Sequence, residues 1–419
     1  MKNYLFLFLI ATLAFGCAAR REPSLQNAGE PWASLRTMGD ALHQAADLGE
    51  NARAAGSDRE NAAGGRFLAE TTVQQLRRAV FSDPDHPAFR PTWPESGHVG
   101  LSNPDNLYES TPIRPGVNYL VRGTRGSTAD LVLQVYETSP GVKGSLRGVS
   151  TLSLDDLELA EDGSFEIHVG PTRQEKNWLL TDATSGMLLV RWSHSDWATE
   201  RAGRVEIVPV GGDGLPSPDL DVADVARKLR DAGAAIPDAS QFWLDFLNRI
   251  RLFTSKNEVM KPRVTGEGGL DGQVSAMGQF SLADDEALIV TVPRTDARYQ
   301  GMQLGNYWFD ALEWANRQTS LAGGQARLGS DGRYHYVIAV RDPGVPNWLD
   351  TTGLTEGIFL LRFQGLKTEI GADDLPETKL VKLTEIGAHL PDDTPKIDAA
   401  ARREQLAARQ IQLQRRYGR

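Results

Sequence analysis

The residues of this chain that could carry chemistry are asparagine, aspartate and tryptophan side chains in short polar segments. The densest segment is Asn103-Pro104-Asp105-Asn106-Leu107-Tyr108. Asn and Asp beside Pro favour turns, because their side chains hydrogen-bond the nearby backbone. Two interpretations are open. The segment could be a structural turn that leads into a β-unit, or a loop whose amides and Asp105 carboxylate, together with Tyr108, bind the hydroxyl groups of a ligand.

An Asn-Trp dipeptide occurs twice, as Asn177-Trp178 and Asn347-Trp348. A buried tryptophan would fill the core of a β-sandwich while the asparagine binds loop backbone. An exposed tryptophan beside amides would instead form a platform on which a sugar ring stacks. Asp350 follows the dipeptide only in the second copy, so this is where the two copies could differ in function.

Two arginines and one aromatic segment complete the set of candidate ligand-binding residues. Arg191 and Arg362 each follow a glycine by five residues. They could form buried ion pairs with aspartates of the same motif, or they could clamp an anionic ligand. The segment 306–310, which contains Trp308, is together with Trp314 unusually aromatic, so it could cover a pocket.

No motif of an established catalytic class is present. The histidines show no metal-binding spacing, and one cysteine cannot build a disulfide or a cysteine metal site. Nucleophile-elbow, Walker A and dinucleotide-binding motifs are missing as well. We therefore predict no catalytic residue, metal or cofactor, and favour non-catalytic binding of a glycan or another small polar ligand. The alternative is a hydrolase of envelope lipid or polysaccharide that uses a carboxylate pair from among Asp105, Asp350 and Glu356.

The candidate residues fall largely within a repeated motif. Residues 162–192 and 331–363 share the order Asp-Gly, alternating apolar residues, Asn-Trp-Leu, Gly and Arg. A repeat of this length predicts two copies of one β-rich unit. Apolar alternation with Gly and Pro between the runs favours short strands in a sandwich or barrel. Within the second copy we expect 289–293 to correspond to 119–123, and 302–304 to 131–133.

Apolar residues at helical spacing predict helices outside these units. One is expected after Pro31, another over 68–80, and two more between 222 and 253, the second apolar enough to lie between the β-units. The expected segments are a signal peptide with a lipidated cysteine (1–17), a tether and N-terminal helices (18–94), a first β-sandwich unit (95–210), a linker and helices (211–263), a second β-sandwich unit (264–388) and a basic helical tail (389–419).

The N-terminus predicts secretion and lipid attachment. Lys2 precedes an apolar run over 5–14 that is too short to anchor in a bilayer, and the run ends in Ala14-Phe15-Gly16-Cys17. This resembles a bacterial lipoprotein signal, in which Cys17 becomes the lipidated first residue. An ordinary cleavable signal is the alternative. Because no Asp follows Cys17, the pattern resembles that of proteins anchored by lipid in the outer membrane, facing the periplasm or the cell surface.

Charge limits the partners. The formal net charge of −10 argues against nucleic acid. The tail over 395–419 is basic, and Leu406, Leu413 and Tyr417 form an amphipathic stripe along it. Such a helix could contact anionic head groups of a membrane, or it could pack its apolar stripe on the acidic body of the protein.

Three segments resemble a known family. Asn103–Tyr108, Gln318–Leu321 and Asp342–Gly353, with Gly357 and Arg362, are similar to proteins carrying domain of unknown function 1214. The resemblance is most specific over 300–363 and weaker over 100–210. It implies jelly-roll-like β-domains and no particular reaction. We therefore predict a mainly β protein with flanking helices (α+β), built from two internally repeated, jelly-roll-like β-sandwich units.

Overall fold

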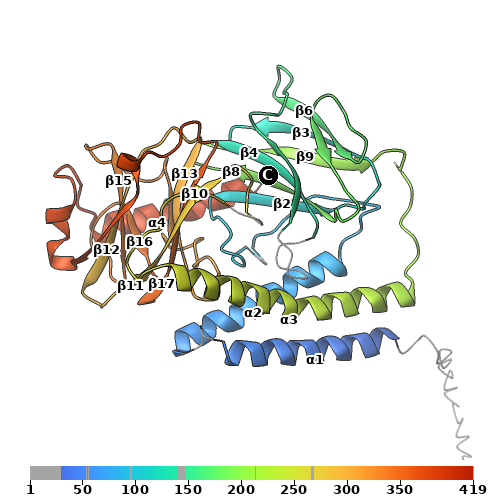
Figure 1. Cartoon of the computed structure of the whole chain (residues 1–419), viewed down its shortest axis with the longest axis horizontal. Coiled ribbons are helices and arrows are strands. Elements are labelled where there is room, and N and C mark those ends of the chain that lie inside the picture. The colour runs from blue at the N-terminus through green and yellow to red at the C-terminus, as the bar shows by residue number, and fades with distance from the viewer. Residues whose placement is uncertain are drawn as a thin grey trace, which may run out of the picture.

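The computed structural model describes residues 30–418 except 53, 55, 95, 96, 139–146, 213 and 266–268. The predicted signal peptide, Cys17 and the tether up to residue 29 lie outside the described residues. The described chain is mainly β, with four sheets and flanking helices (Figure 1). Two β-units follow one another, so the predicted fold class is confirmed.

The first β-unit consists of two sheets that pack on each other. Their strand orders are β1-β2-β8-β4-β5 and β7-β6-β3-β9. The core between them contains Val121 and Ile167 from one sheet and Leu133 and Val190 from the other. The strands are β1 (Arg90–Pro91), β2 (Asn106–Pro112), β3 (Tyr119–Gly126), β4 (Asp130–Tyr136), β5 (Gly148–Ser153), β6 (Ser164–Gly170), β7 (Trp178–Leu180), β8 (Met187–Ser193) and β9 (Ala202–Pro209).

The second β-unit repeats this arrangement strand by strand. Its sheet orders are β10-β11-β17-β13-β14 and β16-β15-β12-β18. The strands are β10 (Arg263–Val264), β11 (Val274–Ser281), β12 (Glu286–Pro293), β13 (Tyr299–Gly305), β14 (Ser320–Ala322), β15 (Arg333–Ala339), β16 (Trp348–Asp350), β17 (Glu356–Gln364) and β18 (Glu377–Lys382), and two 3-10 turns lie beside β18, η2 (Ala372–Asp374) and η3 (Leu383–His389).

In the second unit, β12 is the counterpart of β3 and β13 is the counterpart of β4, as the sequence predicted. The residues of these strands match in a different register from the predicted one. Tyr119 is equivalent to Leu288 rather than Ile289. Leu133 is equivalent to Met302 rather than Leu304. An apolar pattern with a period of two cannot distinguish offsets of two residues, and β12 is buried on both faces, so it has no alternation to fix its register.

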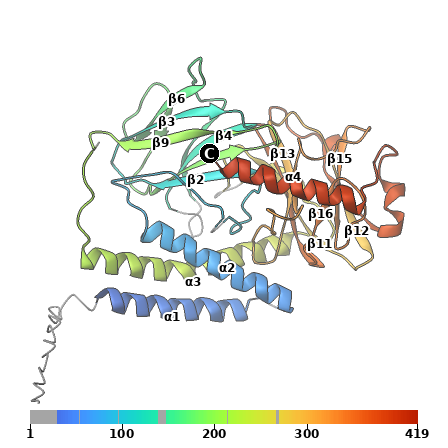
Figure 2. The same ribbon diagram turned by 180° about the vertical axis from the view of Figure 1, so that it is seen from behind.

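Three helices form a layer along one side of both β-units: α1 (Glu30–Glu50), α2 (Asp58–Ala79) and α3 (Val222–Phe253) (Figures 1 and 2). The prediction of two helices over 222–253 is wrong, because α3 continues through Pro237. Close packing supports this part of α3: a Cβ on Gly233 would lie 3.1 Å from the Met38 Cα of α1. Nor does α3 lie between the units. Trp243 stacks on Phe309 at 5.4 Å and covers the second unit from outside.

The basic tail forms α4 (Ala399–Tyr417), which runs across both β-units (Figure 2). Its buried residues are Leu413 and three arginines at intervals of seven, Arg402, Arg409 and Arg416. The amphipathic face of α4 is therefore packed on the body of the protein. Among the described helices, none is both long and apolar enough to cross a membrane.

Candidate functional site

A large cavity lies between the helical layer and the two β-units. Its volume is about 920 Å³, within the range that holds small-molecule ligands. The walls come from the end of α2 and the segment 80–92 after it, from α3, from β2 and β8 of the first unit, and from residues 269–273 and β17 of the second. The cavity is thus formed by segments distant in the sequence.

Two arginines at equivalent positions of the repeat line this cavity. Arg191 of β8 and Arg362 of β17 are 7% and 9% exposed. Arg191 Nη1 donates to Gln134 Oε1 at 2.8 Å, and Arg362 Nη1 donates to Gln303 Oε1. Gln134 of β4 and Gln303 of β13 are themselves equivalent. Each copy of the motif therefore presents an arginine that a glutamine holds in place.

The second nitrogen of each guanidinium is also bound to a neutral group. Arg191 Nη2 donates to the Tyr136 hydroxyl at 2.5 Å, and Arg362 Nη2 donates to the Leu101 carbonyl at 2.6 Å. Among the described residues, neither arginine forms an ion pair. Burial lowers the pKa of the Arg362 guanidinium from its ordinary value, and the charge of Arg191 also lowers it, whereas Asp105 and nearby tyrosines raise it. The positive charges of Arg191 and Arg362 therefore repel each other. These two residues are called the arginine pair.

The other charges around the cavity are largely paired at its mouth. Arg114 binds Asp85 at 2.7 Å, and about half of each side chain is exposed. His86 binds Asp83 at 2.9 Å, and on α3 Arg227 binds Asp224 and Asp231 while Lys228 binds Asp224. These pairs offset much of the charge at the mouth, whereas the arginine pair deeper in the cavity has no ion-pair partner among the described residues.

Of the predicted ligand-binding residues, Asn106, Tyr108 and Arg362 line the cavity. Asn103 and Asp105 do not. The Asp105 carboxylate is 1% exposed and accepts from the Trp197 indole at 3.0 Å and from the Tyr299 hydroxyl at 2.7 Å. Burial raises its pKa. Because Tyr299 belongs to the second unit, Asp105 joins the two β-units rather than facing a ligand.

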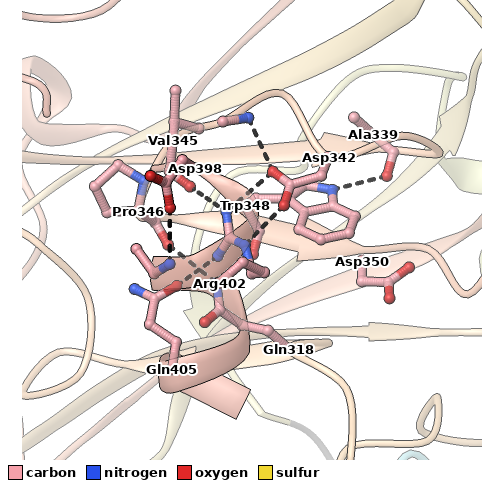
Figure 3. Close-up of polar contacts among 12 residues, drawn as sticks. Gln318, Ala339, Asp342, Val345, Pro346, Trp348, Asp350, Asp398, Arg402 and Gln405 are labelled. Carbon is pink, nitrogen blue, oxygen red and sulfur yellow. Dashed lines mark hydrogen bonds and ion pairs between the residues drawn. The ribbon is translucent and has the colours of Figure 1, made fainter. Parts of the chain in front are cut away.

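Asn347 and Trp348 lie elsewhere, in the second unit beside α4. The Asn347 amide binds both the backbone N–H and the carbonyl of Arg327 at 2.7 Å. Trp348 Nε1 donates to the Ala339 carbonyl at 2.9 Å, and Arg402 lies over its ring at 5.0 Å (Figure 3). Asn177 and Trp178 bind loop and strand backbone in the same way. In both copies the asparagine binds backbone, as the structural interpretation predicts. Neither tryptophan fills the sandwich core, because Trp348 packs in a separate cluster with Val381 and Ile386 and Trp178 is only partly buried.

Asp350 and Trp308 are also occupied by the protein itself. Asp350 pairs with Arg317 at 2.9 Å and accepts from the Thr352 N–H, and in Figure 3 it lies apart from the contacts of Trp348. Trp308 is buried and donates to the Glu60 carbonyl of α2 at 2.8 Å. The structure therefore does not bring Asn103, Asp105, Trp308, Asn347, Trp348 and Asp350 together as a ligand site, because backbone, ion pairs and core packing use their polar groups.

The carboxylates considered for hydrolysis share no cavity. Asp105 and Asp350 are bound as described above, and Glu356 pairs with Lys256 and accepts from the Ser281 hydroxyl at 2.9 Å. None of the three lines the large cavity. Within the part of the chain that the structure describes, no three His, Cys, Asp or Glu side chains gather as a metal ion would need.

Gln134 and Gln303 were not among the residues predicted from the sequence. Both lie two residues beyond equivalent positions, Val132 and Gly301, which pair with the two arginines. The register expected from the apolar pattern matches Gln134 of the first copy with Gly305 of the second. In that alignment the two glutamines do not coincide, and their repetition is hidden. Aligning the copies on all their glutamine and arginine positions would have revealed it.

Comparison with known proteins bears on the fold. No family model matches the chain, and no curated protein matches it. An uncharacterised protein from Burkholderia cenocepacia is similar in structure, with 28% identity, a TM-score of 0.74, and coverage of 85% of this chain and 98% of that chain. A protein from Vibrio parahaemolyticus matches at 12% identity and a TM-score of 0.43, over 82% of this chain and 100% of that chain. The first likeness supports the fold; the resemblance to domain of unknown function 1214 stays a prediction.

Proposed function

We propose that this protein is a non-catalytic, lipid-anchored envelope protein that binds a small anionic ligand in the cavity between its helices and its β-units. One observation carries the proposal. Arg191 and Arg362, equivalent residues of the two repeats, line the same cavity, are almost fully buried, and have no ion-pair partner among the described residues.

The physical argument starts from the cost of burying charge. A charged group removed from water is unfavourable unless it is paired. A guanidinium has five N–H donors in a planar fork that matches carboxylate and phosphate oxygens. Arg191 donates from two nitrogens to neutral acceptors, which orient the guanidinium without neutralising it. An anionic ligand would supply the missing charge.

The two interpretations of the arginines are now weighted differently. Pairing with the aspartates of the repeat does not occur, because Asp162 binds the Ser164 N–H and Asp331 pairs with His335 in exposed turns. We therefore favour the clamp for an anionic ligand. A glycan stays within the proposal if it is acidic. The apolar N-terminal run and Cys17 support envelope attachment, facing the periplasm or the cell surface.

The proposal is tested by ligand binding to the purified protein. A panel of organic carboxylates, phosphate esters and acidic sugars, each with a neutral analogue, is screened by thermal shift and then titrated calorimetrically. We expect anions to bind and neutral analogues not to bind. Arg191→Gln and Arg362→Gln should each weaken binding about 10- to 100-fold, since a charge-assisted hydrogen bond contributes roughly 1.5–3 kcal/mol.

The matched control is Arg204→Gln, an exposed arginine on β9 outside the cavity lining. It should leave affinity unchanged. The proposal is wrong if no anion binds, or if both cavity variants bind the anions as tightly as the unaltered protein does while remaining folded.

A further inference from the structure

The charge balance of the cavity differs between its inner part and its mouth. At the mouth, cations such as Arg114 and Arg227 have aspartate partners, and their side chains are about half exposed. Inside, the arginine pair carries two positive charges that form no ion pair with a described residue, on side chains less than a tenth exposed. Arg78 and Arg90 of the lining also bind only neutral acceptors in their hydrogen bonds, but both are more exposed than the arginine pair. The most deeply buried unmet charge of the cavity is therefore that of the arginine pair.

The repeat also fixes where the two arginines lie relative to each other. Ser193 Oγ donates to Gln364 Oε1 at 2.6 Å. Ser193 stands two residues beyond Arg191, and Gln364 stands two residues beyond Arg362, so equivalent residues of β8 and β17 meet at this bond. Arg191 and Arg362 therefore lie on the two strands that the Ser193–Gln364 hydrogen bond connects. Gln364 also lines the cavity.

Resting on the proposed function, we infer that the bound end of the ligand is dianionic, with one negative charge for each guanidinium of the arginine pair. Phosphate monoesters and dicarboxylates are the small-molecule classes with this chemistry. A monoanion would leave one of the two positive charges buried without a counter-charge, which is unfavourable. Arginine suits this role better than lysine, since each fork can bind two oxygens.

The test compares ligands that differ by a single charge. The full-length protein is titrated with methyl phosphate and dimethyl phosphate, and with succinate and monomethyl succinate. We expect at least one dianion to bind at least tenfold more tightly than its monoanionic partner. If methyl phosphate shows the preference and succinate does not, both charges reside on one group; the reverse result assigns them to two carboxylates.

Variants of the arginine pair provide the second arm. Arg191→Gln and Arg362→Gln each leave one positive charge, so the preference for the dianion should fall below threefold. Arg362→Lys keeps the charge and should keep most of the preference. Thermal denaturation establishes that each variant is folded.

The outcomes separate this inference from the proposed function. If monoanions bind the unaltered protein as tightly as dianions, the inference is overturned and the proposed function stands. If neither kind of anion binds, the proposed function itself fails. If the preference persists in both glutamine variants, the dianion site lies elsewhere and the inference is wrong.

Discussion

Ionisable side chains without counter-charges are the residues whose chemistry the fold changes most. Arg362 is one, and Asp310 is another. Asp310 is 3% exposed, and its Oδ1 has no hydrogen-bond partner among the described residues. Burial raises its pKa well above the ordinary value, and the nearby negative charge of Glu70 raises it further. The folded protein therefore favours the neutral, protonated form of Asp310.

Asp310→Asn tests this at the residue scale. The folded pKa is raised, so the stability that the protonated carboxyl provides is present below its unfolded pKa of about 3.9 and is lost as pH rises. Relative to the unaltered protein, Asp310→Asn should gain stability between pH 4 and 7, by up to about 1.4 kcal/mol per pH unit. Urea denaturation across this range measures the difference.

An aspartate with the opposite shift provides the control. Hydrogen bonds from Ser164 lower the pKa of Asp162. The stability that the Asp162 carboxylate contributes is present above its unfolded pKa and is lost as pH falls. Relative to the unaltered protein, Asp162→Asn should therefore lose stability as pH rises, the reverse of the trend expected for Asp310→Asn. A pH-independent difference for Asp310→Asn would contradict the assignment of a neutral Asp310.

At the scale of elements, the basic helix α4 places its arginines in the interior of an acidic protein, where they contact both β-units. Arg409 donates to the Trp314 carbonyl at 2.7 Å and to both oxygens of Ser320. Its guanidinium lies 4.2 Å from the Trp197 ring, as does that of Arg416. Trp197 belongs to the first unit, and Trp314 and Ser320 belong to the second. The helix thus fastens the two units together.

Arg409→Gln should therefore destabilise the protein by at least about 2 kcal/mol, because it leaves buried acceptors without a donor. Arg403→Gln, at an exposed position of the same helix, should change stability by no more than about 0.5 kcal/mol. Chemical denaturation of both variants makes the comparison. Equal effects would mean that α4 contributes through its helical propensity or net charge rather than through its buried arginines.

At the scale of the whole molecule, polar contacts between the units resemble those inside a single domain. Arg298 of the second unit binds Asp130 of the first at 3.0 Å and Asp155 at 2.7 Å. Asp130 is 1% exposed. Together with Asp105 and Tyr299, this pair makes the interface a specific one, and the same interface sets the position of the two cavity arginines.

Arg298→Met should lower the free energy of unfolding by about 3 kcal/mol, because it leaves the Asp130 carboxylate buried without its partner. Arg122→Met removes an exposed arginine that pairs with Glu166, and it should cost less than about 1 kcal/mol. Denaturation by guanidinium chloride compares the two variants. A similar, small effect of both would indicate that the interface between the units is solvated rather than buried.

The sequence by itself determined the repeat and the mainly β fold class, because these depend on local patterns: apolar alternation, turn residues and the spacing of one motif. The tertiary structure decided the register of β12 and β13, the continuity of α3 and the location of the candidate site. The cavity is lined by residues of α2, α3, β8 and β17, which are far apart in the chain. Whether Arg191 and Arg362 meet an aspartate or an open space depends on how those distant surfaces pack, and local spacing carries no information about that.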